Sequence, residues 1–327
     1  MARLRDLIET HPKNARLRSR IGDDAAVWQP SRSHRSVITT DVLVEGRHFT
    51  RESMTLHDAG YRAMAANLSD LAAMAARPVL ATVALTVPAE LSLVEILELY
   101  TGMLAIASPC GCAIAGGDTA VGDQLSIAIA AIGQTRPAHV KGRRGARPGD
   151  VAAVTGMLGA SRAGLYVSRD PAILDGPLAQ DALASHRRPT PRIAEGRWLG
   201  ASASVRAMMD VSDGLAADLP RVCAASGCGA VVTAEQIPVA PSAHSVASAL
   251  HEDPALFALA GGEDFELLAA IDARAFGHLQ RRFRARFGRE LFEVGRFTEG
   301  SGVRLRKGGI EEPLARAGYD HFSAVSL

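Results

Sequence analysis

Residues 64–74 read Met64-Ala65-Ala66-Asn67-Leu68-Ser69-Asp70-Leu71-Ala72-Ala73-Met74. Alanine and leucine dominate this stretch, and both residues favour a helix. Thr55 can cap the start of the helix, with Asp58 three residues later as in a capping box. Because the stretch is apolar almost all round, we expect the helix to be buried. Asp70 is its one carboxylate, and taken alone it is best explained as a side chain that hydrogen-bonds neighbouring backbone.

The chain of 327 residues has room for roughly two domains of ordinary size. Residues 134–149 form the clearest boundary, since they combine two prolines, three glycines and five basic residues. We therefore expect an N-terminal domain at 1–135, a linker at 136–149 and a C-terminal domain at 150–327.

Helical and strand patterns alternate along both halves, which predicts an α/β fold with two domains. Alternating or β-branched segments predict strands. These segments lie at 36–44, 79–87, 113–115, 125–133, 150–155, 207–209, 231–233, 265–271, 293–297 and 303–306. Helical spacing is clearest at 93–107, 215–225 and 275–287.

The charge balance argues against a polyanionic partner. The 36 basic residues nearly match the 35 acidic ones, so we expect neither nucleic acid nor a membrane surface as partner. The first residues do not form a signal peptide, and no apolar run reaches membrane-spanning length. We therefore expect a cytoplasmic protein. The four cysteines fit neither a paired zinc motif nor a disulfide framework, and buried thiols are the better explanation.

Six aspartates recur in one kind of setting, and most of them lie at the end of an apolar strand or in a glycine-rich turn beside one. They are Asp24, Asp41, Asp70, Asp118, Asp210 and Asp213. A single aspartate of this kind is explained by a cap or a turn, and Asp213 alone could be a helix N-cap. Six converging carboxylates would repel one another unless cations were bound between them. Oxygen ligands suit a hard ion, so the sequence favours Mg²⁺ shared with phosphate oxygens.

The phosphate-binding motifs of P-loop enzymes and of Rossmann dehydrogenases are missing from the sequence. The glycines at 116–117 and 156–159 would let backbone amides approach phosphates, and Arg143 or Arg144 could clamp phosphate oxygens. No nucleophile or general base stands out. This pattern fits phosphoryl transfer to an oxygen that is already ionised, because a phosphate monoester loses its second proton near pH ~6.

The ordered set of motifs resembles the thiamine-monophosphate kinase family, within the superfamily of aminoimidazole ribonucleotide synthetase and selenophosphate synthetase. The similarity spans nearly the whole chain. It rests on Gly22–Ala25, Thr39–Asp41, Glu45–Phe49, Asn67–Met74, Gly116–Thr119, Arg143–Asp150, Val154–Gly156, Asp210–Leu215, Gly261–Glu266 and Gly318–Phe322. The ending Gly-Tyr-Asp-His-Phe is the most specific of these.

The resemblance implies ATP-dependent phosphorylation of thiamine monophosphate to thiamine diphosphate, by direct in-line transfer with several Mg²⁺ ions and no covalent intermediate. It implies catalytic roles for Asp41, Asp70, Asp118 and Arg143. The implied metal ligands are Asp24, Thr39, Thr40, Asp41, Asp70, Asp118, Asp210 and Asp213. The implied contacts to ATP are Tyr100, Gly117, Asp118, Arg143 and Ser212, and those to the thiamine substrate are His48, Glu263 and Tyr319.

The family also implies a homodimer that pairs through its N-terminal sheets, with the C-terminal domain covering the site. Two other functions stay open at this point. One is another ATP-dependent enzyme of the superfamily, and the other is a non-catalytic nucleotide-binding maturation factor.

Overall fold

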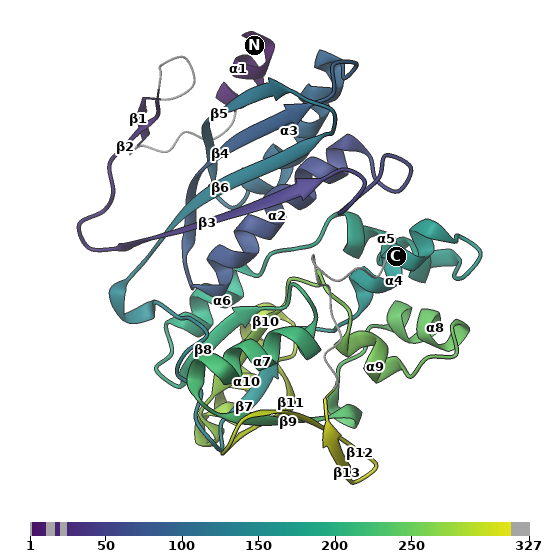
Figure 1. Cartoon of the computed structure of the whole chain (residues 1–327). Helices are drawn as coiled ribbons and strands as arrows, with labels where there is room; N and C mark the ends of the chain where they lie inside the picture. The colour runs from purple at the N-terminus through teal and green to yellow at the C-terminus, as the bar shows by residue number, and fades with distance from the viewer. Residues whose placement is uncertain (1, 11–16, 20–24, 315–327) are drawn as a thin grey trace. The chain divides into compact units, whose positions relative to one another are not determined.

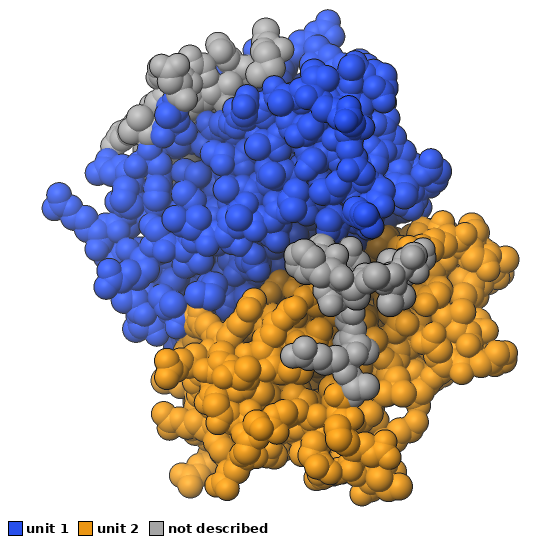
Figure 2. Space-filling model, in the orientation of Figure 1, with its two compact units in different colours: residues 1–140, 187–202 blue, residues 141–186, 203–327 orange. Residues whose placement is uncertain are grey.

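The computed structural model describes residues 2–10, 17–19 and 25–314. The chain divides into two compact units, coloured separately in Figure 2. Unit 1 comprises Met1–Val140 and Arg187–Ser202, and unit 2 comprises Lys141–His186 and Ala203–Leu327. Each unit has its own sheet, helices and buried core, which confirms the mixed α/β class.

Unit 1 is built on a four-stranded sheet with helices on one face (Figure 1). The strand order is β3-β6-β4-β5, in which only the β4–β5 pair is parallel. Its strands are β3 (Arg35–Val44), β4 (Arg77–Val87), β5 (Ala113–Val121) and β6 (Ser126–Thr135). A separate small sheet pairs β1 (Leu17–Ser19) with β2 (Val27–Trp28). The helices are α1 (Ala2–Glu9), α2 (Leu56–Ala73), α3 (Leu93–Ala107), η1 (Pro137–His139) and α6 (Ile193–Gly200).

Helix α2 carries the apolar run that ends at Met74. Thr55 is its N-cap, and the hydroxyl accepts a hydrogen bond from the Asp58 amide at 3.1 Å. Met64, Leu68 and Leu71 have no exposed surface, which confirms the expected burial. The Asp58 carboxylate forms an ion pair with Arg188, which lies in the second segment of unit 1, Arg187–Ser202.

Two glycines allow α2 and α3 to pack closely. A Cβ added to Gly60 of α2 would lie 2.0 Å from the Leu99 carbonyl oxygen of α3. A Cβ added to Gly102 of α3 would lie 1.8 Å from the His57 carbonyl oxygen of α2. Both positions therefore need glycine, and the helix pair forms a compact layer over the sheet.

Unit 2 is built on a seven-stranded mixed sheet of order β13-β12-β9-β11-β7-β10-β8, in which only β12–β9 is parallel. Its strands are β7 (Val151–Val154), β8 (Val205–Asp210), β9 (Gly229–Thr233), β10 (Leu267–Ile271), β11 (Phe292–Thr298), β12 (Gly302–Lys307) and β13 (Ile310–Pro313). Its helices are α4 (Ala160–Arg169), α5 (Gly176–Arg187), α7 (Leu215–Ser226), η2 (Ala234–Gln236), α8 (Pro241–Ala249), α9 (Pro254–Leu259) and α10 (Ala273–Phe287). Helix α7 packs on β8, β9 and β12, and this places its N-terminus at the end of β8.

Crossing a membrane requires a helix that is both long and apolar. Within residues 2–10, 17–19 and 25–314, no helix combines these two properties.

Candidate active site

Three oxygen-bearing side chains predicted as ligands meet in unit 1. Thr39 and Asp41 are two residues apart on β3, so their side chains lie on the same face of the sheet. Asp70 lies on α2, which packs on that face, and the Thr39 hydroxyl donates a hydrogen bond to the Asp70 carboxylate. The structure therefore brings the side chains of Thr39, Asp41 and Asp70 together. Asp70 is half-buried, whereas the sequence predicted that this helix is buried on all sides.

The two carboxylates of this cluster influence each other. Burial and, secondly, the negative charge of Asp70 raise the pKa of Asp41 from 3.8 to about 6. The three side chains of this cluster offer two carboxylates and a hydroxyl, which are all oxygen donors. This donor set fits a hard divalent cation, which would restore the charged form of Asp41.

Asp41 gives a pH-dependent prediction. The pKa of Asp41 in the folded state lies above its ordinary value, so the folded protein favours the protonated carboxyl. The stabilisation that this provides is complete below about pH 4, and it is lost as the pH rises through about 6. Asp41→Asn cannot ionise, so the variant does not lose stability in this pH range. We expect the variant, in EDTA, to match the wild type at pH 4 and to exceed its free energy of unfolding by roughly 1–3 kcal/mol at pH 7.

Urea denaturation at the two pH values measures this difference. Asp181→Asn, which removes an exposed carboxylate on α5, is the matched control. A stability difference between Asp41→Asn and the wild type that does not change with pH would contradict the assignment.

Thr40 and Asp118 lie on the other face of the same sheet. Thr40 alternates with Thr39, and its hydroxyl donates to the Ile129 carbonyl oxygen at 3.0 Å. The register aligns Asp118 with Ala84, which lies in the same cross-strand row as Val42. This row faces away from the helices. Asp41 lies inside β3, as the predicted strand 36–44 requires. Asp118 lies inside β5, so the expectation that the strand ends at 115 and that Asp118 sits in a glycine-rich turn is wrong.

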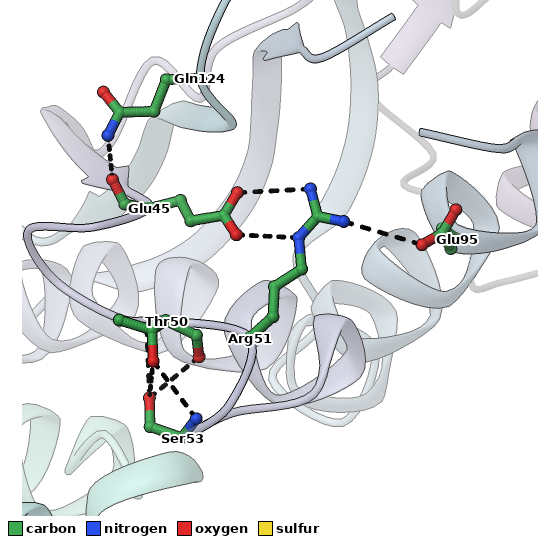
Figure 3. A network of polar contacts seen from close by, with 6 residues as sticks. All are labelled: Glu45, Thr50, Arg51, Ser53, Glu95 and Gln124. Atoms are coloured by element: carbon green, nitrogen blue, oxygen red, sulfur yellow. Dashed lines mark hydrogen bonds and ion pairs between the residues drawn. The ribbon is translucent and has the colours of Figure 1, made fainter. Parts of the chain in front are cut away.

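The segment that follows β3 is fixed by a polar network (Figure 3). Arg51 contacts Glu45 at 2.8 Å and Glu95 of α3 at 3.9 Å, and the Gln124 side chain donates to the Glu45 carbonyl oxygen. His48 belongs to this turn, and its Nδ1 accepts a hydrogen bond from the Val44 amide at 3.1 Å. The imidazole is thus held at the end of the strand that carries Asp41.

A second group of predicted residues lies in unit 2. Asp210 is the last residue of β8 and is buried, while Ser212 and Asp213 are half-buried in the turn before α7. The carboxylate of Asp218, which was not predicted, accepts hydrogen bonds from the amides of Ser212 at 2.9 Å and Asp213 at 3.0 Å. Arg221 contacts both Asp213 and Asp218 at 2.5 Å.

Asp218 is fully buried, and burial and then the Asp213 charge raise its pKa to about 6. The sequence feature that could have identified Asp218 is its position in the first turn of a predicted helix, where the helix dipole and free amides attract negative charge.

The segment Gly261–Glu266 is hydrogen-bonded to the turn that contains Ser212. The Glu263 amide donates to the Ser212 carbonyl oxygen at 2.7 Å, and the Phe265 amide donates to that of Val211 at 3.0 Å. Glu263 and Phe265 adopt φ values of 61° and 50°, a region that non-glycine residues rarely occupy. The turn that carries Ser212 and the turn that carries Glu263 therefore form one rigid structure.

Two acids beside Glu263 have structural roles. The Asp264 carboxylate accepts hydrogen bonds from the amides of Gly159 at 2.6 Å and Ser161 at 3.1 Å, at the start of α4. Burial raises the pKa of Asp264 to about 7. Glu266 is buried and contacts Thr155 and Arg289, each at 2.6 Å. The glycine-rich segment 156–159 is thus held between these two acids.

The remaining predicted residues lie elsewhere. Tyr100 is 3% exposed in the core of unit 1, and burial raises its pKa to about 12. Arg143 is exposed, and its carbonyl oxygen accepts a hydrogen bond from Ser226 at 3.0 Å. Asp24 and Tyr319 lie outside the described residues. In the part of the chain that is described, no group of three or more His, Cys, Asp or Glu side chains lies close enough to share a metal ion.

Comparison with known proteins decides the family. Residues 22–135 match the family described as "AIR synthase related protein, N-terminal domain". Residues 147–308 match the family described as "AIR synthase related protein, C-terminal domain". The thiamine-monophosphate kinase of Synechococcus elongatus is 35% identical over 92% of this chain and 91% of its own. This chain belongs to the thiamine-monophosphate kinase family.

Solved structures of the thiamine-monophosphate kinase family have the same fold. The thiamine-monophosphate kinase of Stenotrophomonas maltophilia superposes with a TM-score of 0.82 at 33% identity, covering 93% of this chain and 94% of its own. AaThiL complexed with AMPPCP and TMP gives 0.78 at 30% identity, covering 92% of both chains. The hydrogenase maturation protein HypE of E. coli gives 0.80 at 23% identity over 98% of both chains, which shows a shared fold alone.

Proposed function

We propose that the chain phosphorylates thiamine monophosphate to thiamine diphosphate with ATP and Mg²⁺, by direct in-line transfer of the γ-phosphate. The observation that carries this proposal is membership of the thiamine-monophosphate kinase family over nearly the whole chain. The relative complexed with AMPPCP and TMP supports it further. The oxygen-only cluster of Thr39, Asp41 and Asp70 is consistent with a cation-assisted reaction.

The protein residues bind and orient the two substrates. In unit 1, the residues that would hold Mg²⁺ are Thr39, Asp41 and Asp70. In unit 2, they are Asp210 and Asp213. Thr40, Asp24 and Asp118 remain further candidate ligands. Bound Mg²⁺ supplies positive charge that offsets the charge on the phosphate oxygens. His48, Glu263 and Tyr319 would contact the thiamine substrate, and Tyr100, Gly117 and Ser212 would contact ATP.

The acceptor needs no general base from the protein. A phosphate monoester loses its second proton near pH ~6, so its oxygen is already a nucleophile at neutral pH. No covalent intermediate is required, and the work of the site is to align the two phosphates and compensate their charge.

The reaction is tested by incubating the protein with ATP, Mg²⁺ and thiamine monophosphate, with free thiamine as a parallel acceptor. We expect thiamine diphosphate from the monophosphate alone. If ATP binds and neither acceptor is phosphorylated, the acceptor assignment is wrong and other acceptors within the superfamily must be tested.

Arg143 is proposed to bind ATP. Its side chain is exposed while its backbone is anchored by Ser226, so the guanidinium is presented from a fixed position. We expect Arg143→Ala to raise the KM for ATP about tenfold and that for thiamine monophosphate less, since one charge-assisted phosphate contact is lost. Initial-rate kinetics measure both constants, and Arg281→Ala, at an exposed position of α10, is the control. A larger rise for thiamine monophosphate would place Arg143 on the acceptor side.

We also propose that the chain forms a homodimer through the open face of the unit 1 sheet. On this face Ile38 is 70% exposed and Val42 51%. Cross-strand pairing extends the face with Ala128 and Ala130 of β6, whereas Ile132 packs against the cluster that contains Leu17. Thr40 and Asp118 lie on the same face, so it combines exposed apolar side chains with a few polar ones, as a protein–protein interface commonly does.

Ile38→Lys tests the dimer. We expect the variant to be monomeric at concentrations where the wild type is dimeric, because it places a charge in an apolar interface. Ile310→Lys is the matched control, since Ile310 is 67% exposed on β13 of unit 2. Light scattering coupled to gel filtration gives the masses. A monomeric wild type, or a dimeric Ile38→Lys, would refute this interface.

A further inference from the structure

Two residues of α7 hold the turn Asp210–Gly214 from outside. The fully buried Asp218 carboxylate receives the amides of Ser212 and Asp213. Arg221, one helical turn later, places Nη1 2.5 Å from Asp218 Oδ1 and Nη2 2.5 Å from Asp213 Oδ2. One guanidinium therefore bridges two carboxylates.

The two contacts of this guanidinium differ in burial. The Asp218 side chain has no exposed surface, whereas the Asp213 side chain is 28% exposed and that of Arg221 41%. Asp218 remains bound to two amides whatever Arg221 does, so its position is fixed. In the described part of the chain, the carboxylate of Asp213 makes its one ion pair with Arg221. The solvent-facing contact, between Arg221 and Asp213, is therefore the one that can open.

We propose that Arg221 is a latch on Asp213, which occupies the carboxylate until a divalent cation replaces it. The inference rests on the proposed function, which assigns Asp213 to Mg²⁺. A guanidinium and a cation compete for the same oxygen and repel each other. Arg221 stays anchored on Asp218 when the cation binds, so Asp213 is released without loss of the turn. Arg221 is a positioning residue and not a catalytic one.

The direction in which cation affinity changes when Arg221 is removed distinguishes a latch from a residue that only stabilises the turn. If Arg221 is a latch, its removal frees Asp213 and lowers the positive potential, so the affinity for a cation rises. If Arg221 only braces the turn, its removal misplaces Asp213 and the affinity falls. Arg221 is partly exposed, so Arg221→Gln is expected to fold.

Binding of Mn²⁺ to the full chain without nucleotide, measured by electron paramagnetic resonance, tests the latch. We expect Arg221→Gln to lower the Kd about three- to tenfold, because a competing charge is removed, and Arg221→Lys to stay near the wild type. Asp213→Asn should weaken binding, and adding Arg221→Gln to it should then change little. Arg296→Gln, which removes a partly exposed arginine paired with Glu293 in unit 2, should leave the Kd unchanged.

Three results would overturn the latch. An unchanged or higher Kd in Arg221→Gln, with binding still weakened by Asp213→Asn, rejects the latch and leaves the proposed cation site intact. If Arg296→Gln lowers the Kd for Mn²⁺ as much as Arg221→Gln does, the change is due to net charge, and the latch is rejected. Unaltered binding in Asp213→Asn removes Asp213 from the proposed cation site, and the latch is rejected with it.

Discussion

Asp70→Asn is expected to lower kcat about 10³-fold while leaving the fold intact. The substitution keeps the size of the side chain and an oxygen that can accept the Thr39 hydroxyl, but it removes one of two neighbouring negative charges. Under the proposed function, the loss of turnover would follow from lower affinity for Mg²⁺ and from lost charge compensation. Because Asp70 raises the pKa of Asp41, its removal also relieves repulsion in the absence of metal.

The measurement for Asp70→Asn pairs steady-state kinetics with melting in EDTA. The melting temperature should stay within about 3 °C of the wild type or rise. Asp181→Asn serves again as the control for loss of a carboxylate from an exposed helix position. A fall of the melting temperature large enough to explain the lost activity would mean that Asp70 is a structural hydrogen-bonding group and not part of a cation site.

Asp218→Ala is expected to destabilise the protein by about 2–4 kcal/mol, more than any other substitution proposed for this chain. The change leaves the amides of Ser212 and Asp213 without their acceptor and removes the buried partner of Arg221. Asp213→Ala removes only the half-exposed contact to Arg221, so we expect a cost below about 1 kcal/mol.

Urea denaturation of both alanine variants in EDTA gives the two free energies of unfolding. Asp218→Asn should recover part of the loss, because its amide oxygen can take the place of Oδ2, which accepts both backbone hydrogen bonds, while the ion pair with Arg221 is still lost. Equal and small costs for Asp218→Ala and Asp213→Ala would show that the buried carboxylate does not hold the turn.

Local patterns in the sequence were sufficient for much of the fold. Thr55 and the apolar run after it predicted the cap and burial of α2, and both are confirmed. Alternation in residues 36–44 predicted β3, and the strand geometry puts Thr39 and Asp41 on one face. The same alternation explains why Thr40 lies on the other face.

Other features depend on long-range pairing, which one sequence does not reveal. The face on which Asp118 lies follows from the register between β5 and β4, including an irregularity between Ala81 and Thr82. The inclusion of 187–202 in unit 1 accompanies a contact between Arg188 and Asp58, 130 residues apart. Asp218 was missed because its role depends on the shape of the turn before α7, where two amides point back to the helix.

The most direct test of the proposed reaction uses ATP labelled in its γ-phosphate, with Mg²⁺ and thiamine monophosphate. Direct transfer predicts that the label appears in thiamine diphosphate, with ADP formed in equal amount and no labelled protein after quenching. Label recovered only as free phosphate, or bound covalently to the chain, would contradict direct transfer between the two substrates.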